Sequence, residues 1–363
     1  MTPRELNRTT LTRRLLLNRK RIPADQALAR LAGLQAQATI PPYVGLWTRL
    51  DRFRAADLTR LIQSRRVVRA TMMRHTLHLV TAEDFVELRG AVQPALTRSF
   101  GGATRKRLAG VDLEPLLRAA RERFAAGPAT FAEIRVLVSE LMPGSDVDAL
   151  AYGVRTFVPL VQVPADGKWG YSTSAPYAHA EDWLEQRLPD SHDARPLIRS
   201  YLAAFGPATV RDIQAWSGLS GLQGAVDELK GGLRTFRDER GAELFDLPGA
   251  PVARADAPAP PRFLPDYDNV LLAYADRSRV IAHEHRPAVF LTGGRVRATF
   301  LIDGFVQGTW KVEKHKGLAA LVIEPFGRLA TKDRAALISE GETLIRFVEE
   351  GAESFSVRIE KAA

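Results

Sequence analysis

The chain has 363 residues, of which 45% are hydrophobic and 26% charged, a composition typical of a globular protein with about two to four modules. It has no run of about 18 apolar residues and no secretory signal, so we expect a cytoplasmic protein with no membrane association. It also has no cysteine, which excludes disulfides, thiolate nucleophiles and cysteine-based metal sites. The net charge is +9, and residues 1–110 carry 21 Lys and Arg against seven Asp and Glu. This surplus favours a nucleic acid as partner, the alternative being an Arg-rich solvated face.

The apolar spacing in the first third of the chain predicts helices followed by a two-stranded hairpin, an order typical of a winged helix-turn-helix. We expect helices over residues 9–18, 24–34, 55–63 and 82–96, and strands over residues 67–71 and 76–80. Pro41 and Pro42 should prevent any continuation of the second helix. The polar stretch 101–107 is expected to be a linker.

The middle of the chain contains an internal repeat, because Gly127–Ile134 recurs as Gly206–Ile213 with Gly-Pro-Ala-Thr in both copies. In each copy the Thr is expected to cap a helix, and the acid three residues later completes a capping box. Each copy continues into a further helix and a hairpin, with strands expected over residues 160–163, 168–171, 233–236 and 242–245. The repeat therefore predicts two more units like the first.

A linker rich in Pro and Ala is expected over residues 247–262. Beyond it, alternating apolar and polar residues predict strands and one helix, with the strands over 270–274, 288–292, 295–302, 305–313, 318–325 and 354–359 and the helix over 332–349. The predicted fold class is α+β: three tandem winged helix-turn-helix modules plus a C-terminal antiparallel β-barrel-like module with a helix. The predicted domains are 1–107, with the candidate catalytic motif, 108–186, 187–262 including the linker, and 263–363.

Two amides, Gln35 and Gln37, lie where the second predicted helix ends. Residues two apart share a face only in extended chain, so a turn at Gly33 would point both amides the same way. The structural alternative is a pair of surface amides at a frayed helix end.

The residues around this pair carry a family resemblance. Leu34 precedes Gln35-Ala36-Gln37, Pro41-Pro42 and Trp47 follow it, and Arg74-His75-Thr76-Leu77-His78-Leu79 comes later. This pattern resembles the bacterial winged-helix DNA glycosylases of the AlkZ/YcaQ-like family over the whole chain. Gln37 makes the motif resemble that of the AlkZ branch, since the YcaQ branch has Asp at this position.

The resemblance implies a monofunctional DNA glycosylase with Gln35 and Gln37 as catalytic residues. Its substrates would be cationic N7-alkylated purines, including bulky natural-product adducts or interstrand crosslinks, and its product an abasic site, in DNA repair or self-resistance. Glycosidic cleavage is usually aided by a carboxylic acid, but residues 33–42 contain no acid, and Gln cannot titrate. Such a site suffices for a base that is already cationic. We expect Gln37 to place water and Gln35 to support the cation or the lesion.

Other residues are weaker candidates. His75 and His78 are auxiliary candidates that would bind a phosphate or orient a Gln, or are simply satisfied histidines. Lys20 is the lysine nearest to Gln35 in sequence, which argues against a Schiff-base lyase step. The DNA-binding candidates, each of which has a structural alternative, are Arg13, Arg14, Arg19, Lys20, Arg21, Arg65, Arg66, Arg74 and Trp169.

We expect a monomer that acts on double-stranded DNA containing an alkylated purine, without metal or cofactor. A winged-helix transcriptional regulator without catalysis is the alternative, and a purely architectural DNA binder is a third possibility. Both would bind DNA without forming a product. A regulator usually dimerises to read two half-sites, whereas three different modules in one chain fit a monomer better.

Overall fold

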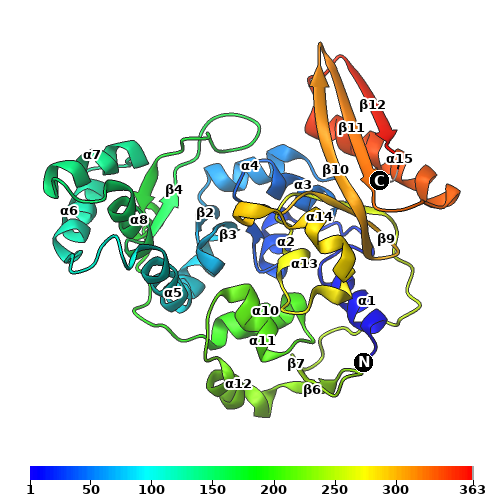
Figure 1. The fold of residues 1–363 in the computed structure, drawn as a ribbon, viewed down its shortest axis with the longest axis horizontal. Helices are drawn as coiled ribbons and strands as arrows, with labels where there is room; N and C mark the ends of the chain where they lie inside the picture. The colour runs from blue at the N-terminus through cyan, green and yellow to red at the C-terminus, as the bar shows by residue number, and fades with distance from the viewer. Residues whose placement is uncertain (362–363) are drawn as a thin grey trace.

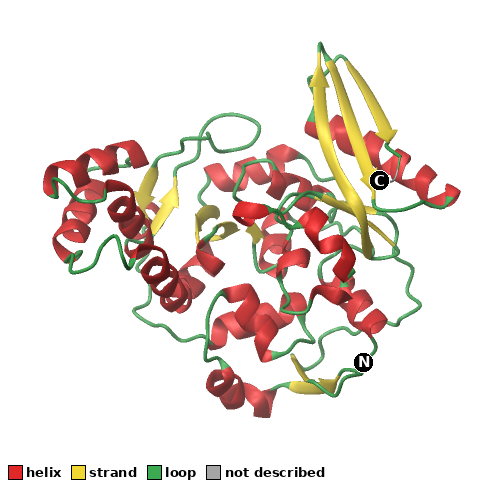
Figure 2. Ribbon diagram, in the orientation of Figure 1, coloured by secondary structure: helices red, strands yellow, loops and turns green. Residues whose placement is uncertain are grey.

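The computed structural model describes residues 1–361, and its mixture of helices and strands confirms the α+β class. Figure 1 shows residues 114–179 at one end of the molecule and residues 305–359 at the other, with the N-terminal helices between them. Helices predominate in the first two thirds, and the longest strands lie near the C-terminus (Figure 2). No helix within residues 1–361 is long and apolar enough to cross a membrane.

The first unit follows the predicted order of helices and a hairpin. Its elements are α1 (Pro3–Arg13), α2 (Ala24–Arg30), β1 (Leu34–Gln35), α3 (Pro41–Trp47), α4 (Ala55–Gln63), β2 (Val67–Thr71), η1 (Met73–His75), β3 (Leu77–Thr81) and α5 (Ala82–Thr104). Helix α4 and strand β2 have the predicted bounds. Helix α1 begins earlier than predicted because Thr2 and Glu5 form a capping box and Pro3 occupies the first turn.

As predicted, the second helix does not continue through Pro41 and Pro42, and it ends at Arg30. The two prolines begin a new helix, α3, because the first turn of a helix needs no backbone N–H donors. The linker predicted at residues 101–107 is largely helical, since α5 continues to Thr104. Phe100 packs against Tyr152 and Phe157, and this packing outweighs the low helix propensity of the neighbouring glycines.

The repeat folds as two similar sets of elements. The first set is α6 (Glu114–Ala125), α7 (Phe131–Leu141), α8 (Val147–Phe157), β4 (Leu160–Gln162) and β5 (Tyr177–His179), followed by α9 (Ala180–Leu184). The second is α10 (Arg195–Phe205), α11 (Val210–Ser217), α12 (Gln223–Leu229), η2 (Lys230–Gly232), β6 (Arg234–Arg237) and β7 (Glu243–Asp246). Both predicted capping boxes are confirmed, Thr130 with Glu133 and Thr209 with Asp212.

The second strand of the middle hairpin is not where the sequence predicted it. The strand expected at residues 168–171 is part of a long loop, and β5 lies at Tyr177–His179 instead. Tyr171 is buried among the apolar residues of the first unit, and Trp169 packs beside it. Side-chain packing against the first unit thus takes the place of strand pairing.

The first unit and the two sets of the repeat, together called the three sets, each have a short extended segment that pairs with the second strand of the hairpin. This segment lies between α2 and α3 in the first set, and between the first two helices in each of the other two. In the first set, Leu34 and Gln35 on β1 pair with β3. Ala129 pairs with Tyr177, and Ala208 with Phe245, in the other two. A single pairing between Ala70 and Val161 joins the first two hairpins into one sheet of order β1-β3-β2-β4-β5, whereas β6 and β7 form a sheet of their own.

The C-terminal sheet is open, which corrects the predicted barrel-like module. Its strand order is β12-β11-β10-β9-β8, and β12 runs parallel to β11 after the crossover through α15. The elements are β8 (Arg262–Leu264), α13 (Asn269–Leu272), η3 (Arg277–Arg279), η4 (His283–His285), α14 (Arg286–Val289), η5 (Thr292–Gly294), β9 (Thr299–Ile302), β10 (Phe305–His315), β11 (Leu318–Pro325), α15 (Thr331–Val348) and β12 (Ser354–Ile359). Strands β11 and β12 have the predicted bounds.

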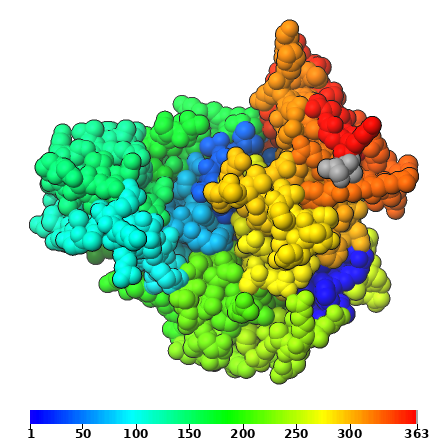
Figure 3. All heavy atoms as spheres, viewed as in Figure 1, coloured from blue at the N-terminus to red at the C-terminus, as the bar shows by residue number. Residues whose placement is uncertain are grey.

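Strands predicted at residues 270–274 and 288–292 are also wrong, because the short helices α13 and α14 lie there. Short apolar runs do not distinguish a strand from a buried helix. One apolar core includes Leu11, Phe85, Trp216 and Leu271, so segments from across the chain pack together. In Figure 3 the mid-blue residues of the first unit lie between residues coloured cyan to green and the yellow residues, and the dark blue residues at the N-terminus lie on the other side of the yellow ones. The four domain boundaries stay a prediction.

Candidate active site

The Gln motif lies on extended backbone at the edge of β3. Gly33 turns the chain after α2 with φ +75°, and a Cβ on it would lie 2.6 Å from Val80 Cγ1. Leu34 and Ala36 are buried in the apolar core of the first unit. Because side chains alternate along extended chain, Gln35 lies on the opposite face. The extended geometry predicted for the pair is present at Gln35, which pairs with β3, and Gln37 follows in a bend just beyond the strand.

Gln35 is held by an arginine. Its side chain is almost buried, and its Oε1 accepts a hydrogen bond from Arg74 Nη2 at 2.7 Å. Arg74 lies in the left-handed region, with φ 55°, and its Nη1 donates to the carbonyl oxygen of Trp216. Burial lowers the pKa of Arg74 to about 10, which leaves it charged at neutral pH. One guanidinium thus fixes the Gln35 amide and ties it to the third set of helices.

Gln37 is exposed, and its amide is oriented by the backbone. Its Oε1 accepts a hydrogen bond from Leu77 N at 3.0 Å. Arg69 supports the same stretch, because its Nε donates to Ala36 O at 2.8 Å and its Nη2 to Gln37 O at 3.2 Å. Each carbonyl oxygen has two lone pairs, so the Gln37 oxygen can accept one more hydrogen bond from solvent.

The two auxiliary histidines are both buried. His78 lies opposite Gln35 in the β1–β3 register, and its Nδ1 lies 3.1 Å from Thr76 O. Burial, with Arg74 nearby, lowers its pKa to about 3. His75 packs on Tyr152 and has partners at both ring nitrogens, the Tyr152 hydroxyl at 2.8 Å and Thr156 Oγ1 at 3.2 Å. Its pKa is lowered to about 4, chiefly by burial. His75 therefore joins η1 to α8 and has no ring nitrogen left for a phosphate.

Three of the predicted phosphate contacts are engaged inside the protein. Arg13 forms a buried ion pair with Asp246 at 2.6 Å. Arg14 is fully buried over the Phe205 ring, at 4.2 Å from its centroid, and burial lowers its pKa to about 9. Arg74 is engaged by Gln35 and Trp216, as described above. The charge surplus of the first third is thus partly internal, and these three arginines are not free to bind a DNA backbone.

The other predicted contacts lie nearer the surface. Lys20 and Arg21 are exposed. Arg65 is exposed and lies over the Trp183 ring, and Arg66 pairs with Asp25. Arg19 is partly buried, stacks on Trp47 and pairs with Glu340 at 2.6 Å.

Trp169 is a packing residue in this structure and lies on a loop, not on a hairpin strand. Its ring contacts Tyr43 edge-on, with 4.9 Å between centroids, and also contacts Phe347. It is therefore not placed as a wedge that would enter DNA.

Sequence reasoning missed Arg69, whose side chain holds the backbone of the motif. The signal was an arginine in the middle of the predicted strand at residues 67–71, and in the structure all five residues of this strand are buried. A buried arginine requires hydrogen-bond acceptors nearby. Only the tertiary structure identifies the carbonyl oxygens of Ala36 and Gln37 as those acceptors.

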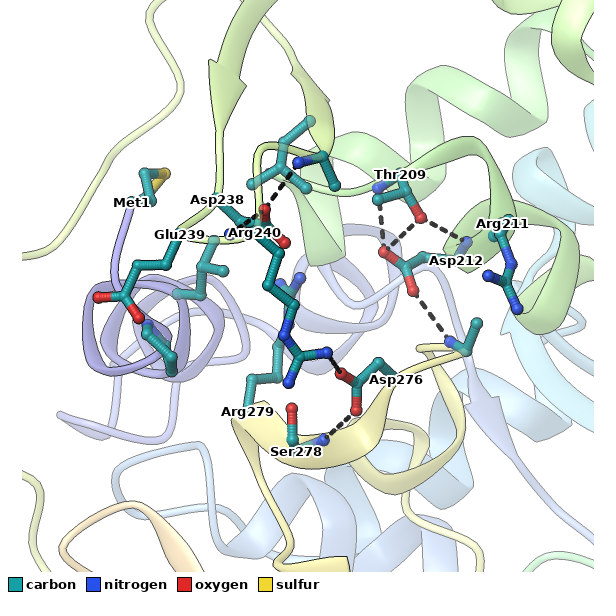
Figure 4. Close-up of a pocket in the computed structure, with 15 residues that line it drawn as sticks. Met1, Thr209, Arg211, Asp212, Asp238, Glu239, Arg240, Asp276, Ser278 and Arg279 are labelled. Atoms are coloured by element: carbon teal, nitrogen blue, oxygen red, sulfur yellow. Dashed lines mark hydrogen bonds and ion pairs between the residues drawn. The ribbon is translucent and has the colours of Figure 1, made fainter.

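A polar cavity of about 380 Å³ lies away from the Gln motif, between α1, α11 and the β6–β7 turn (Figure 4). Its lining includes an ion pair and several hydrogen bonds between charged side chains and the backbone. Asp276 accepts from Arg240 at 3.2 Å and from Ser278 N at 3.0 Å, and Asp212 completes the Thr209 cap. These contacts join segments of the fold, and Gln35 and Gln37 do not line this cavity.

Comparison with known proteins places the chain in a family. The family model described as DNA glycosylase AlkZ-like matches residues 28–347. A protein of Streptomyces sahachiroi named interstrand DNA cross-link repair glycosylase is 31% identical over 159 residues, and the match spans about two fifths of each chain. The solved structure of the S. sahachiroi DNA glycosylase AlkZ superposes with a TM-score of 0.79 at 21% identity, covering 99% of this chain and all of that one, which shows a shared fold. The chain belongs to the AlkZ-like DNA glycosylase family, as its sequence predicted.

Proposed function

We propose that this protein is a monofunctional DNA glycosylase that hydrolyses the N-glycosidic bond of cationic N7-alkylated purines in double-stranded DNA and leaves an abasic site. Bulky adducts and interstrand crosslinks are included among the substrates. The relative from S. sahachiroi is named for cross-link repair, which supports this range.

One observation carries the proposal: the Gln motif presents two oriented neutral amides, and the stretch of chain around it contains no acid. Between Asp25 and Asp51 the sequence has neither Asp nor Glu. Both Gln oxygens are fixed by N–H donors, from Arg74 and from Leu77 N. Amides that do not titrate suit a base whose positive charge already makes it a good leaving group.

The contacts favour different roles for the two amides. The Gln35 oxygen accepts from a guanidinium, and the nearby positive charge opposes a cation at that oxygen, whether on the sugar or on the N7-alkylated purine. Gln35 is therefore better placed to hold the geometry of the motif than to contact either cation through its oxygen. The Gln37 oxygen is held by a neutral backbone N–H and is exposed, so it suits the placement of water and the stabilisation of the sugar cation.

The reaction balances without a cofactor. The bond between C1′ and N9 breaks, and its electron pair moves onto the cationic purine, which leaves as a neutral base. Water placed by Gln37 adds its oxygen to C1′, and its proton passes to solvent. Stabilisation of charge by one oriented dipole is worth about 3–4 kcal/mol in comparable sites.

We further propose that the three sets of helices and hairpins are winged-helix modules that hold the duplex as a monomer. Lys20 and Arg21 are exposed and are our phosphate contacts. Replacing both by Gln should reduce the slope of log affinity against log salt by about 2, because each phosphate contact contributes about 0.9.

The direct test uses duplex DNA with a single 7-methylguanine, followed by hot alkali and gel separation of the strands. We expect cleavage at the adduct with the unchanged protein and a loss of roughly 100-fold with Gln37→Ala. Tight binding without cleavage, for this adduct and for larger N7 adducts, would contradict the proposal and favour the transcriptional regulator. Cleavage that persists at the same rate in both Gln37→Ala and Gln35→Ala would show that the pair is structural.

A further inference from the structure

A cavity of about 510 Å³ lies beside the Gln motif, between the loop that follows Gln37 and the C-terminal sheet. Ala38 and Thr39 line it on the side of the motif. Adjacent Cα atoms are about 3.8 Å apart, so the wall of the cavity begins within one residue of Gln37. The cavity and the candidate active site are therefore neighbours in space.

Most of the cavity wall is apolar. The residues that give it this character are Ile40, Val44, Pro265, Trp310, Val312 and Val348. Trp310 and Val312 are two residues apart on β10 and share one face of the strand. The indole N–H of Trp310 already donates to Leu264 O at 2.9 Å, so its ring contributes apolar surface and not a free donor.

Three of the charged residues that line the cavity form ion pairs. Lys311 pairs with Glu324 at 3.2 Å, and Arg297 pairs with the same carboxylate. Glu349 pairs with Lys314 at 2.7 Å. A fourth, Asp266, accepts a hydrogen bond from Ala298 N at 2.8 Å, and burial raises its pKa. An anionic ligand would have to break these pairs and approach Asp266, whereas an uncharged apolar group would only displace water. The lining thus disfavours an anionic ligand and accommodates an uncharged one.

We propose that this cavity is a subsite for an uncharged aromatic substituent carried on N7 of the excised purine. The inference rests on the proposed function and names its substrate class more closely. N7 lies in the major groove, so a substituent on it projects away from the base stack. The volume is within the range of about 300–1,000 Å³ typical of small-molecule sites, which a methyl group would leave almost empty.

The test compares two duplexes that carry 7-methylguanine or 7-(naphthylmethyl)guanine at the same position. For each, kcat/KM of base release and the dissociation constant are measured with the unchanged protein and with Val312→Trp, which fills the cavity. We expect the kcat/KM ratio, naphthylmethyl over methyl, to fall about tenfold or more in Val312→Trp. Val136→Trp is the matched control, because Val136 is 57% exposed on α7, and it should leave the ratio unchanged.

Two results would overturn the subsite. An unchanged ratio in Val312→Trp would show that the substituent does not enter the cavity, and an equal loss with both adducts would show that the cavity only supports the Gln loop. If Val312→Trp fails to fold, Val312→Phe makes the same test with a smaller ring.

Failure of the proposed function is distinguishable from failure of the subsite. If the unchanged protein releases neither base, the glycosylase proposal fails, and the subsite is judged by binding alone. Tighter binding of the naphthylmethyl duplex than of the methyl duplex, lost in Val312→Trp, supports the subsite. Equal binding of the two duplexes overturns it.

Discussion

The connection that contains the extended segment differs between the first and third sets. In the third set it spans residues 206–209, and a Cβ on Gly206 would lie 2.5 Å from Asp246 Oδ1 and 2.7 Å from Leu202 O. Its last residue, Thr209, caps α11. In the first set it spans residues 31–40, and Ile40 provides no side-chain cap for α3. The short connection is closely packed, and the longer one leaves space for two amides at the edge of a sheet.

We therefore infer that this connection contributes to stability in the third set and to the proposed chemistry in the first. Changes in the third set should lower the free energy of unfolding and leave the rate per folded molecule unchanged. Changes at the Gln motif in the first set should chiefly lower the rate of base release.

The largest effect is expected from Asp246→Ala, which leaves Arg13 buried without its ion-pair partner. Removing one partner of a buried pair costs about 3–5 kcal/mol, which urea unfolding would measure. Asp256→Ala is the control, because Asp256 pairs with Arg254 on the surface, and an exposed pair contributes about 0–1 kcal/mol. Equal losses in the two variants would show that the buried pair does not join α1 to the third set.

The next largest effect is expected from Gln35→Ala. In the other two sets an alanine, Ala129 or Ala208, lies in the corresponding extended segment. We expect base release in single-turnover assays to slow by about 100-fold. The free energy of unfolding should fall by only about 1–3 kcal/mol, because Arg74 Nη2 loses its acceptor. Gln26→Ala, on the exposed face of α2, should change neither quantity. A normal rate in Gln35→Ala would remove this residue from the site.

Arg74→Lys should slow base release by about tenfold, since a lysine lacks the planar fork that contacts Gln35 and Trp216 together. Arg74 is a positioning residue, so we expect kcat to fall and KM to change little. A rise in KM alone would instead indicate that Arg74 binds DNA. Steady-state kinetics with a 7-methylguanine duplex separates these outcomes.

Thr209→Ala removes the cap of α11 and should cost about 1 kcal/mol of stability. Thermal unfolding measures this loss. The rate of base release per folded molecule should stay the same, because the cap lies in the third set. Thr209→Ser keeps the hydroxyl and should retain most of the stability. A slower rate with unchanged stability would contradict the division between the two connections.

The smallest effect is expected from pH on the rate. Burial lowers the pKa of His75 to about 4 and that of His78 to about 3, and Gln does not titrate, so base release should be constant between pH 6 and 8. Stability should respond differently: histidines of the unfolded chain take up protons near pH 6.5, so stability is full above that pH and falls as the pH drops from about 6.5 toward 4. Rates and urea unfolding at several pH values test both statements. A rate that changes tenfold per pH unit would indicate a titrating catalytic group.

Much of the fold was determined by local sequence signals. The capping boxes at Thr130 and Thr209 fixed two helix starts, because a side chain and its partner three residues later suffice to form them. Apolar periodicity located α4, β2, β11 and β12. The turn at Gly33 and the spacing of Gln35 and Gln37 predicted the extended motif, and the family followed from the residues around it.

Tertiary structure decided what depends on partners far apart in the chain. Whether Arg13 meets a phosphate or Asp246 cannot be read from a helix, since the two residues are distant in sequence. Tyr171 packs in the core of the first unit, so the second strand of the middle hairpin lies at residues 177–179 and not at the predicted 168–171. The parallel pairing of β12 with β11 left the C-terminal sheet open. The sequence alone determined which groups are available for chemistry, and long-range packing decided which of them are buried, paired or exposed.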